Sequence, residues 1–71
     1  MRELKIGGKY RHYKDREYVV LGVAKHSETL EKLVVYRAEY GDKEIWVRPY
    51  EMFLDEVEVG GERVSRFAEI D

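Results

Sequence analysis

Polar and apolar residues alternate along this chain in short segments that are separated by turn-forming residues. No window of ten or more residues places apolar side chains at helical spacing without a glycine or proline break. The turn signals have the short spacing typical of an all-β domain, and they fall at Gly7-Gly8, Lys14-Asp15-Arg16, Gly41-Asp42, Pro49 and Gly60-Gly61. The pattern therefore predicts a mainly β fold.

The segments between these turns predict four longer strands followed by two short ones. The longer strands are expected at residues 9–14, 17–25 and 33–40 and in the hairpin arm before Pro49, and the short ones at "EVEV" and "VSRF". Proline cannot donate to a sheet ladder, but it suits the first position of a helix. We therefore expect Pro49 to end the fourth strand and "PYEMFLD" to form one helical turn.

Alternation in the third strand places Val34, Tyr36, Ala38 and Tyr40 on one face. The sequence does not decide whether Trp46 faces the core or the solvent, because its neighbours on the strand could fill the core in its place. The apolar centres of the segments predict a core that contains Val20, Leu21, Val34, Val35, Ile45, Val47 and Phe53.

Four longer strands, one helical turn and no long helix describe a small, strongly bent barrel. We expect an SH3-like barrel, an SH3-type roll, in which residues 1–71 form a single domain. A chain of 71 residues hides only about 60% of the surface that its unfolded form exposes. The core is therefore thin, and we expect any function to lie on the surface of a monomer rather than in an enclosed cavity.

Composition narrows the class of protein further. The chain is 44% hydrophobic and 39% charged, which favours a folded, soluble domain over a disordered one. The absence of cysteine excludes disulfides and thiolate metal sites and fits the cytoplasm. The longest apolar run, "YVVLGVA", is far shorter than the ~20 residues of a membrane span, so no membrane partner is expected. The net charge is −2, yet residues 1–37 carry nine Lys and Arg against five Asp and Glu.

Five ordered motifs resemble a known bacterial family, catalogued as domain of unknown function 1653. They are "GGKYRHYK", "YVVLGVAKHSET", "VVYRAEYG", "WVRPYEMF" and "RF", and they cover nearly the whole chain. The resemblance implies a stand-alone bacterial domain with an SH3-type β-roll and no established activity or ligand. The chain departs from the family pattern at Asp15, where glycine is expected after the lysine.

The motif "HSET" offers a histidine, a hydroxyl and a carboxylate in succession. Neighbours on an extended chain point to opposite faces, whereas a nucleophile and its base must converge. We interpret the motif as a loop in which the Ser27 and Thr29 hydroxyls bond nearby backbone. Together with His12, the residues His26 and Glu28 could also supply two histidines and one carboxylate as ligands to a metal ion. Two histidines without characteristic spacing make a poor site, so we expect no metal, no other cofactor and no catalytic residue.

Cations and aromatic residues interleave in "KYRHYK", and Trp46 and Arg48 share one face of the fourth strand. Small barrels use such sets to bind the bases and phosphates of nucleic acid. The same composition also protects an ordinary edge strand.

Three functional hypotheses follow from these features. The first is a binding module for nucleic acid or nucleotide that uses a surface patch of aromatic and basic residues. The second is an accessory domain that binds a protein or a small ligand at the rim of the HSET loop, and the third, the least favoured, is an enzyme that works through His26 and Glu28. The candidate ligand-binding residues are Tyr10, His12, Lys14, His26, Glu28, Tyr36, Trp46 and Arg48.

Overall fold

The structure, a computed structural model, describes residues 4–70. The mainly β class and the single short helix after Pro49 are confirmed. The segment "VSRF", predicted as one strand, belongs to two, because Arg66 separates them. The elements in chain order are β1 (Lys9–His12), β2 (Glu17–Lys25), β3 (Lys32–Ala38), β4 (Ile45–Pro49), α1 (Tyr50–Phe53), β5 (Glu56–Val59), β6 (Glu62–Ser65) and β7 (Phe67–Ile70).

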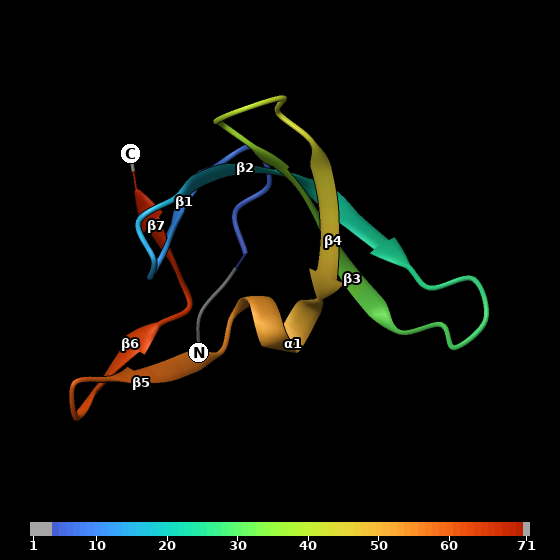
Figure 1. Cartoon of the computed structure of the whole chain (residues 1–71). Helices are drawn as coiled ribbons and strands as arrows, with labels where there is room; N and C mark the ends of the chain where they lie inside the picture. Colours follow the sequence, from blue (N-terminus) through green and yellow to red (C-terminus); the bar gives the residue numbers. More distant parts are fainter. Residues whose placement is uncertain (1–3, 71) are drawn as a thin grey trace.

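Five of the strands form one antiparallel sheet in the order β4-β3-β2-β1-β7, and β5 pairs with β6 in a separate ribbon. In Figure 1 the larger sheet arches over α1, and the β5–β6 ribbon leads away from it. Within residues 4–70 the two edge strands of the larger sheet, β4 and β7, do not pair with each other. The sheets are therefore open, and closure into the predicted SH3-like barrel is not confirmed.

Strand β2 carries a bulge that increases the curvature of the sheet. Its register with β3 shifts between Val20 and Gly22, so Leu21 is an extra residue with no partner opposite it. A bulge bends its strand and strengthens the local twist. Because directly opposite residues share a face, Val20 and Val23 both point to the side of the sheet that faces α1. We call this side the inner face and the opposite side the outer face.

The core lies between the inner face and the short helix. Phe53 of α1 and Phe67 of β7 stack with their ring centroids 4.0 Å apart and their planes 5° from parallel. The predicted burial of Val20, Val34 and Phe53 is confirmed. The buried hydrophobic residues of the described chain are Tyr10, Val20, Val34, Tyr36, Ala38, Phe53 and Phe67.

The predicted burial of Leu21, Ile45 and Val47 is wrong, since their exposed fractions are 39%, 62% and 57%. Leu21 is the bulge residue, and Ile45 and Val47 lie on the outer face, opposite Arg37 and Val35. Val35 is only partly buried. Within residues 4–70 α1 and Phe53 pack against the inner face only, so apolar residues of the outer face stay in contact with solvent.

The turn between β1 and β2 contains the departure from the family pattern. Asp15 has a φ of 74°, in the left-handed region that glycine favours and that aspartate tolerates better than most residues. The Asp15 N–H donates to the His12 carbonyl oxygen over 2.7 Å, and the His12 N–H donates to the Arg16 carbonyl oxygen over 2.7 Å. The aspartate thus adopts the backbone geometry that a glycine would supply.

Candidate ligand-binding surface

Aromatic side chains line the inner face around Phe67. The rings of His12, Tyr18 and Tyr36 each meet the Phe67 ring edge-on, with centroid distances of 4.9, 5.6 and 5.5 Å. Tyr40 continues the row, its centroid 5.6 Å from that of Tyr18. Phe67 is buried while Tyr40 is 38% exposed. The row formed by Phe67, Tyr36, Tyr18 and Tyr40, which we call the aromatic row, therefore runs from the core to the surface.

Two arginines pack against this row from different strands and loops. The Arg48 guanidinium carbon lies 5.6 Å from the Phe67 centroid, and its Nε donates to the Tyr36 hydroxyl over 3.4 Å. The Arg16 guanidinium carbon lies 4.8 Å from the centroid of Tyr40. Both distances suit cation–π attraction, which is strongest where water is excluded.

His12 stands in the positive field of three further side chains. The pKa of His12 is lowered from its ordinary value, first by burial and then by the positive charges of Arg48, Arg66 and Lys14. Its Nδ1 accepts a hydrogen bond from the Lys14 backbone N–H over 3.2 Å. The neutral ring therefore carries its proton on Nε2. A neutral imidazole with one N–H donor consequently lies among cations.

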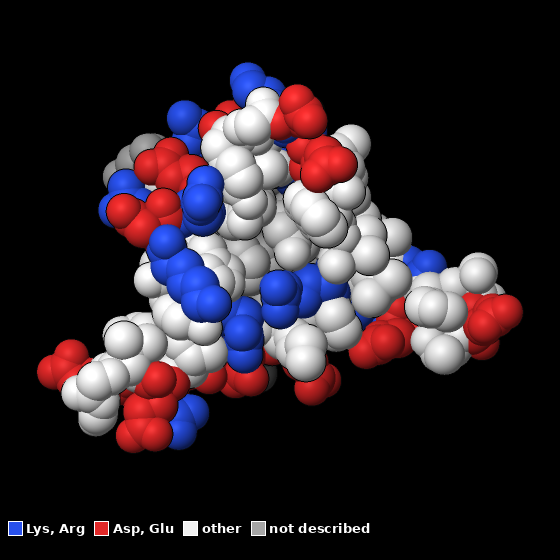
Figure 2. Space-filling model, viewed as in Figure 1, with Lys and Arg blue, Asp and Glu red and all other residues white. Residues whose placement is uncertain are grey.

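Within residues 4–70 no ion pair neutralises Lys14, Arg16, Arg48 or Arg66, which we call the basic rim. The ion pairs of this part of the chain involve other cations, namely Lys5, Arg11, Arg37 and Arg63. The Nε of Arg66 is buried and has no hydrogen-bond partner among the described residues. Figure 2 shows Lys and Arg gathered across the centre of this face, between the β1–β2 side and β4, below a hollow of uncharged atoms.

Tyr18 of the aromatic row adds no negative charge to this surface. The hydroxyls of Tyr18 and Tyr40 share a hydrogen bond of 2.8 Å. Burial, followed by this hydrogen bond, raises the pKa of Tyr18 to about 12. The Tyr18 phenol consequently stays neutral at physiological pH, and the surface can bind an anion without opposing charge from this side chain.

The structure brings four of the eight predicted site residues together here, namely His12, Lys14, Tyr36 and Arg48. Tyr10 belongs to the core instead, where its hydroxyl accepts a hydrogen bond from the Lys5 N–H over 2.9 Å. Trp46 lies opposite Tyr36 and thus on the inner face, yet it is 49% exposed because β4 is an edge strand.

The remaining two candidates, His26 and Glu28, lie elsewhere. Tyr10 pairs with Tyr18 near the start of β2, whereas His26 follows Lys25 at its end. At about 3.3 Å per strand residue, roughly 25 Å separate the two positions along β2. In Figure 1 the β2–β3 loop projects away from β1 and β7. The predicted rim is therefore divided into two distant parts.

Hydrogen bonds within the β2–β3 loop engage the imidazole of His26 and the hydroxyl of Thr29. The Nδ1 of His26 accepts from the backbone N–H groups of Glu28 and Thr29 over 3.1 and 3.3 Å. The Thr29 hydroxyl accepts from the Glu31 N–H over 3.2 Å, as predicted. No side-chain hydrogen bond of Ser27 occurs among residues 4–70, and the histidine fills the role expected of that serine. The motif shapes a hairpin loop.

Sequence reasoning missed four residues of the surface: Arg16, Tyr18, Tyr40 and Arg66. Alternation in the third strand placed Tyr40 on the face of Tyr36, and this was a usable signal. Arg16 and Arg66 lie in turns between strands, where no periodicity indicates the direction of a side chain. Their convergence depends on the pairing of β1 with both β2 and β7.

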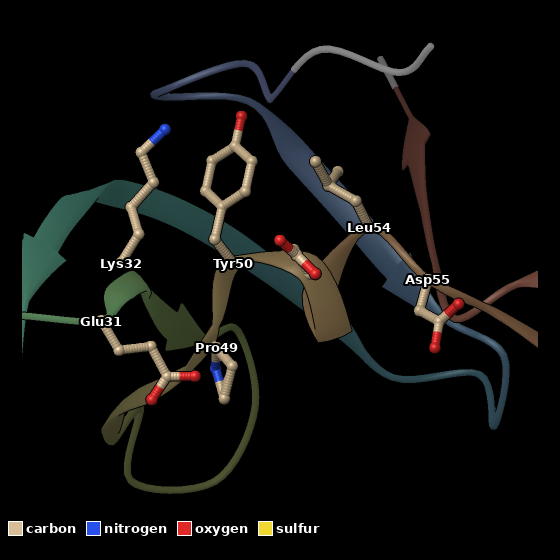
Figure 3. A pocket seen from close by; sticks show the side chains of 7 residues that line it. Glu31, Lys32, Pro49, Tyr50, Leu54 and Asp55 are labelled. Carbon is tan, nitrogen blue, oxygen red and sulfur yellow. The ribbon is translucent and has the colours of Figure 1, made fainter. Parts of the chain in front are cut away.

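Two grooves lie beside this surface, and the second shares His12 with it. One of about 700 Å³ is formed where the start of β3 meets α1. In Figure 3 the Lys32 and Tyr50 side chains lie side by side there, while Glu31 and Asp55 point elsewhere. The Lys32 Nζ is 4.2 Å from the Tyr50 centroid, so the ring already holds this cation. A second groove of about 460 Å³ borders β1, β6 and β7 and includes His12.

Metal and membrane features were sought within the same residues. Among residues 4–70 no three His, Asp or Glu side chains cluster in a way that would hold a metal ion. No helix in the described part of the chain is long and apolar enough to cross a membrane.

The fold and this surface define a class of protein: a small, mainly β domain whose open sheet presents aromatic rings and cations on its inner face. Residues 8–69 match the family described as "Protein of unknown function (DUF1653)", and the chain belongs to this family. The chain is similar to the crystal structure of a protein belonging to DUF1653 from Bordetella bronchiseptica. The two are 33% identical with a TM-score of 0.86, over 99% of this chain and 91% of that chain. A search of the curated proteins gave no match.

Proposed function

We propose that this domain binds a nucleotide, free or within single-stranded nucleic acid, on the aromatic row and the basic rim. One observation supports the proposal above all: three cations act on His12, a fourth lies over the ring of Tyr40, and within residues 4–70 no carboxylate pairs with any of them. Arginine and lysine bind phosphate oxygens, and aromatic rings stack with bases of any sequence.

The residues divide naturally between the two halves of a nucleotide. Arg48 and Arg66 would contact the phosphate, since a guanidinium matches its oxygens with two parallel donors. His12, neutral with Nε2 protonated, would donate one further hydrogen bond. The exposed ring of Tyr40 would meet the base.

The positive surface is local, which limits the size of the ligand. The whole chain has a net charge of −2, so a long polyanion gains no general attraction. Figure 2 shows Lys and Arg gathered across the centre of one face. We therefore expect the domain to contact one or two nucleotides, and to lose affinity steeply as salt rises.

The test is a titration of the labelled protein, followed by amide chemical shifts, with inorganic phosphate, adenosine, AMP and a short oligothymidylate. AMP should perturb the amides of the aromatic row and basic rim at lower concentration than phosphate or adenosine alone. Arg48→Ala should weaken AMP binding about 10-fold to 100-fold, as expected for the loss of a charged hydrogen bond of ~1.5–3 kcal/mol.

Arg37→Ala is the matched control, because Arg37 lies in the same sheet but on the outer face, paired with Glu39 over 3.1 Å. It should leave AMP affinity unchanged. Equal losses in the two variants, or shifts that map to the HSET loop, would contradict the proposed site. Binding of oligothymidylate far more tightly than AMP would identify the ligand as single-stranded nucleic acid rather than the free nucleotide.

A further inference from the structure

The outer edge of β4 combines apolar side chains with free backbone groups. β4 is the last strand of its sheet, and within residues 4–70 no strand pairs with its outer edge. Ile45, Trp46 and Val47 are consecutive and all exposed. Edge strands usually carry charges, prolines or bulges that prevent pairing with another chain. In this stretch of three residues β4 has none of these.

The backbone groups that face outward follow from the pairing with β3. The Ala38 N–H donates to the Glu44 carbonyl oxygen over 2.9 Å, so Glu44 faces β3. Backbone groups in an antiparallel strand alternate in direction, and Trp46 and Arg48 therefore face β3 as well. Ile45 and Val47 point their N–H and C=O groups away from the sheet. Pro49 also faces outward, where its missing N–H costs no ladder bond.

We propose that β4 pairs with β4 of a second copy of this chain, antiparallel and with the two-fold axis at Trp46. In this register Ile45 of each copy lies opposite Val47 of the other. Each pair exchanges two backbone hydrogen bonds, so four bonds join the copies. The two larger sheets then form one continuous sheet across the interface, and Pro49 lies just beyond the bonded pairs.

The charges beside the apolar stretch complement one another in the same register. Glu44 of one copy lies directly opposite Arg48 of the other, and the two-fold axis generates this pair twice. Within residues 4–70 neither side chain belongs to an ion pair of its own chain. Opposite charges across an antiparallel pair stabilise it. Both pairs flank the two Trp46 side chains on the inner face, while Ile45 and Val47 meet on the outer face.

Neighbouring registers satisfy fewer groups. With the axis at Val47, Ile45 lies opposite Pro49, which has no N–H to donate. With the axis at Ile45, Val47 lies opposite Lys43, whose φ of 54° is outside the extended region. The register about Trp46 is thus the one in which Ile45 and Val47 both use their free N–H and C=O groups. A monomer, the expectation from sequence, assumes that this stretch does not form an open edge.

A first experiment measures mass against protein concentration by sedimentation equilibrium. The average mass should rise from 8.5 kDa toward twice that value as concentration increases. Glu44→Lys places like charges opposite each other. It should shift the midpoint of the monomer–dimer transition at least 10-fold toward higher protein concentration. Glu28→Lys makes the same charge change on the distant β2–β3 loop and should leave it unchanged. Arg48 would face Glu44 of the other copy in the dimer and phosphate in the proposed nucleotide site. The AMP titration is therefore made at a protein concentration where the mass is 8.5 kDa, so that the two proposals are tested separately.

A second experiment tests the register by oxidative cross-linking, which the absence of native cysteine makes simple. Opposite positions without mutual hydrogen bonds have Cα atoms ~4.5 Å apart, within disulfide range. Trp46→Cys should therefore form a cross-linked dimer rapidly. The two Ile45 positions lie diagonally, about 7–8 Å apart or more, beyond that range, so Ile45→Cys should cross-link only as slowly as Glu28→Cys.

The two experiments together decide the proposal. Faster cross-linking of Trp46→Cys than of both controls, with a concentration-dependent mass, supports pairing about Trp46. A mass of 8.5 kDa at every concentration up to the millimolar range would overturn it. Faster cross-linking of Ile45→Cys than of Trp46→Cys would overturn the register.

Discussion

The inner and outer faces of the larger sheet are built from alternate residues of the same strands, yet the arginines on the two faces have different partners. On the outer face Arg11 binds Glu17 over 3.1 Å and Arg37 binds Glu39 over 3.1 Å. On the inner face Arg48 lies against the rings of Phe67 and Tyr36. No carboxylate accompanies it within residues 4–70. These two outer arginines are neutralised in place, whereas Arg48 on the inner face remains available to an external anion.

This difference shows that net charge is a poor guide to function in so small a domain. A total of −2 conceals one face with an uncompensated positive field. The pairing of strands, rather than composition, decides which cations meet a carboxylate. The following experiments test whether the two faces differ in stability as well as in charge.

The largest difference is expected between Phe67→Ala and Val47→Ala. Phe67 is buried at the centre of the aromatic row, so its truncation should lower the free energy of unfolding by about 3–5 kcal/mol. Val47 is exposed on the outer face of the single chain, and its truncation should change the stability of the 8.5 kDa monomer by less than ~0.5 kcal/mol. Urea unfolding of both variants gives the comparison. Similar losses would show that the outer face is covered by another molecule in solution.

A smaller effect of opposite sign is expected for Arg66→Met. Methionine keeps most of the apolar stem but removes the buried Nε that lacks a partner among the described residues. An unsatisfied buried donor costs about 1–3 kcal/mol, so the variant should unfold at higher urea concentration while binding AMP less tightly. The outer counterpart, Arg37→Met, loses a partly exposed ion pair near the surface and should cost ~1 kcal/mol or less. A clear loss of stability in Arg66→Met would mean that the guanidinium stabilises the fold.

His12 gives the inner face a pH dependence. Its pKa is lowered in the folded protein, so the unfolded chain takes up a proton first as the pH falls. Stability should therefore decline as the pH drops below about 6.5, the ordinary histidine value. His12→Gln should reduce this decline between pH 7 and pH 5.5, measured by urea unfolding at each pH. An unchanged decline would assign it to other groups.

The smallest effect is expected for Asp15→Gly. Glycine adopts the positive φ of this position without strain but adds freedom to the unfolded chain. The net gain should be about 0.5 kcal/mol or less. The variant also removes the carboxylate 3.7 Å from Arg11, and AMP should bind slightly tighter because one negative charge beside the basic rim is lost. Thermal unfolding and the AMP titration measure the two effects.

Sequence periodicity predicted which residues share a face, but it did not predict which face is covered. In β3 the shared face of Val34, Tyr36 and Ala38 is buried, in agreement with the predicted alternation. In β4 the same alternation fits either face. The choice depends on Phe53 and Phe67, which reach the inner face from later in the chain. Long-range packing of this kind leaves no trace in a local pattern.

The candidate site was partly predictable for the same reason. His12, Lys14, Tyr36 and Arg48 have side chains suited to ligand binding. They lie on or beside strands in which the alternation of side chains between the two faces is clear from the sequence. HSET had suitable chemistry too, but its groups are used by the loop backbone. Local hydrogen bonding of a histidine to its neighbours cannot be distinguished from a free imidazole by residue type alone.

The extra residue in β2 gives this chain an unusual tolerance to a change in length. Deleting any other residue from the middle of a strand moves everything beyond it to the opposite face. Deleting Leu21 does not, because Val20 and Gly22 already point to opposite faces. We expect a chain that is one residue shorter at this position to keep its inner and outer sets intact while its sheet flattens. Curvature, and with it the depth of the inner hollow, can thus be altered by one codon without a new hydrophobic pattern.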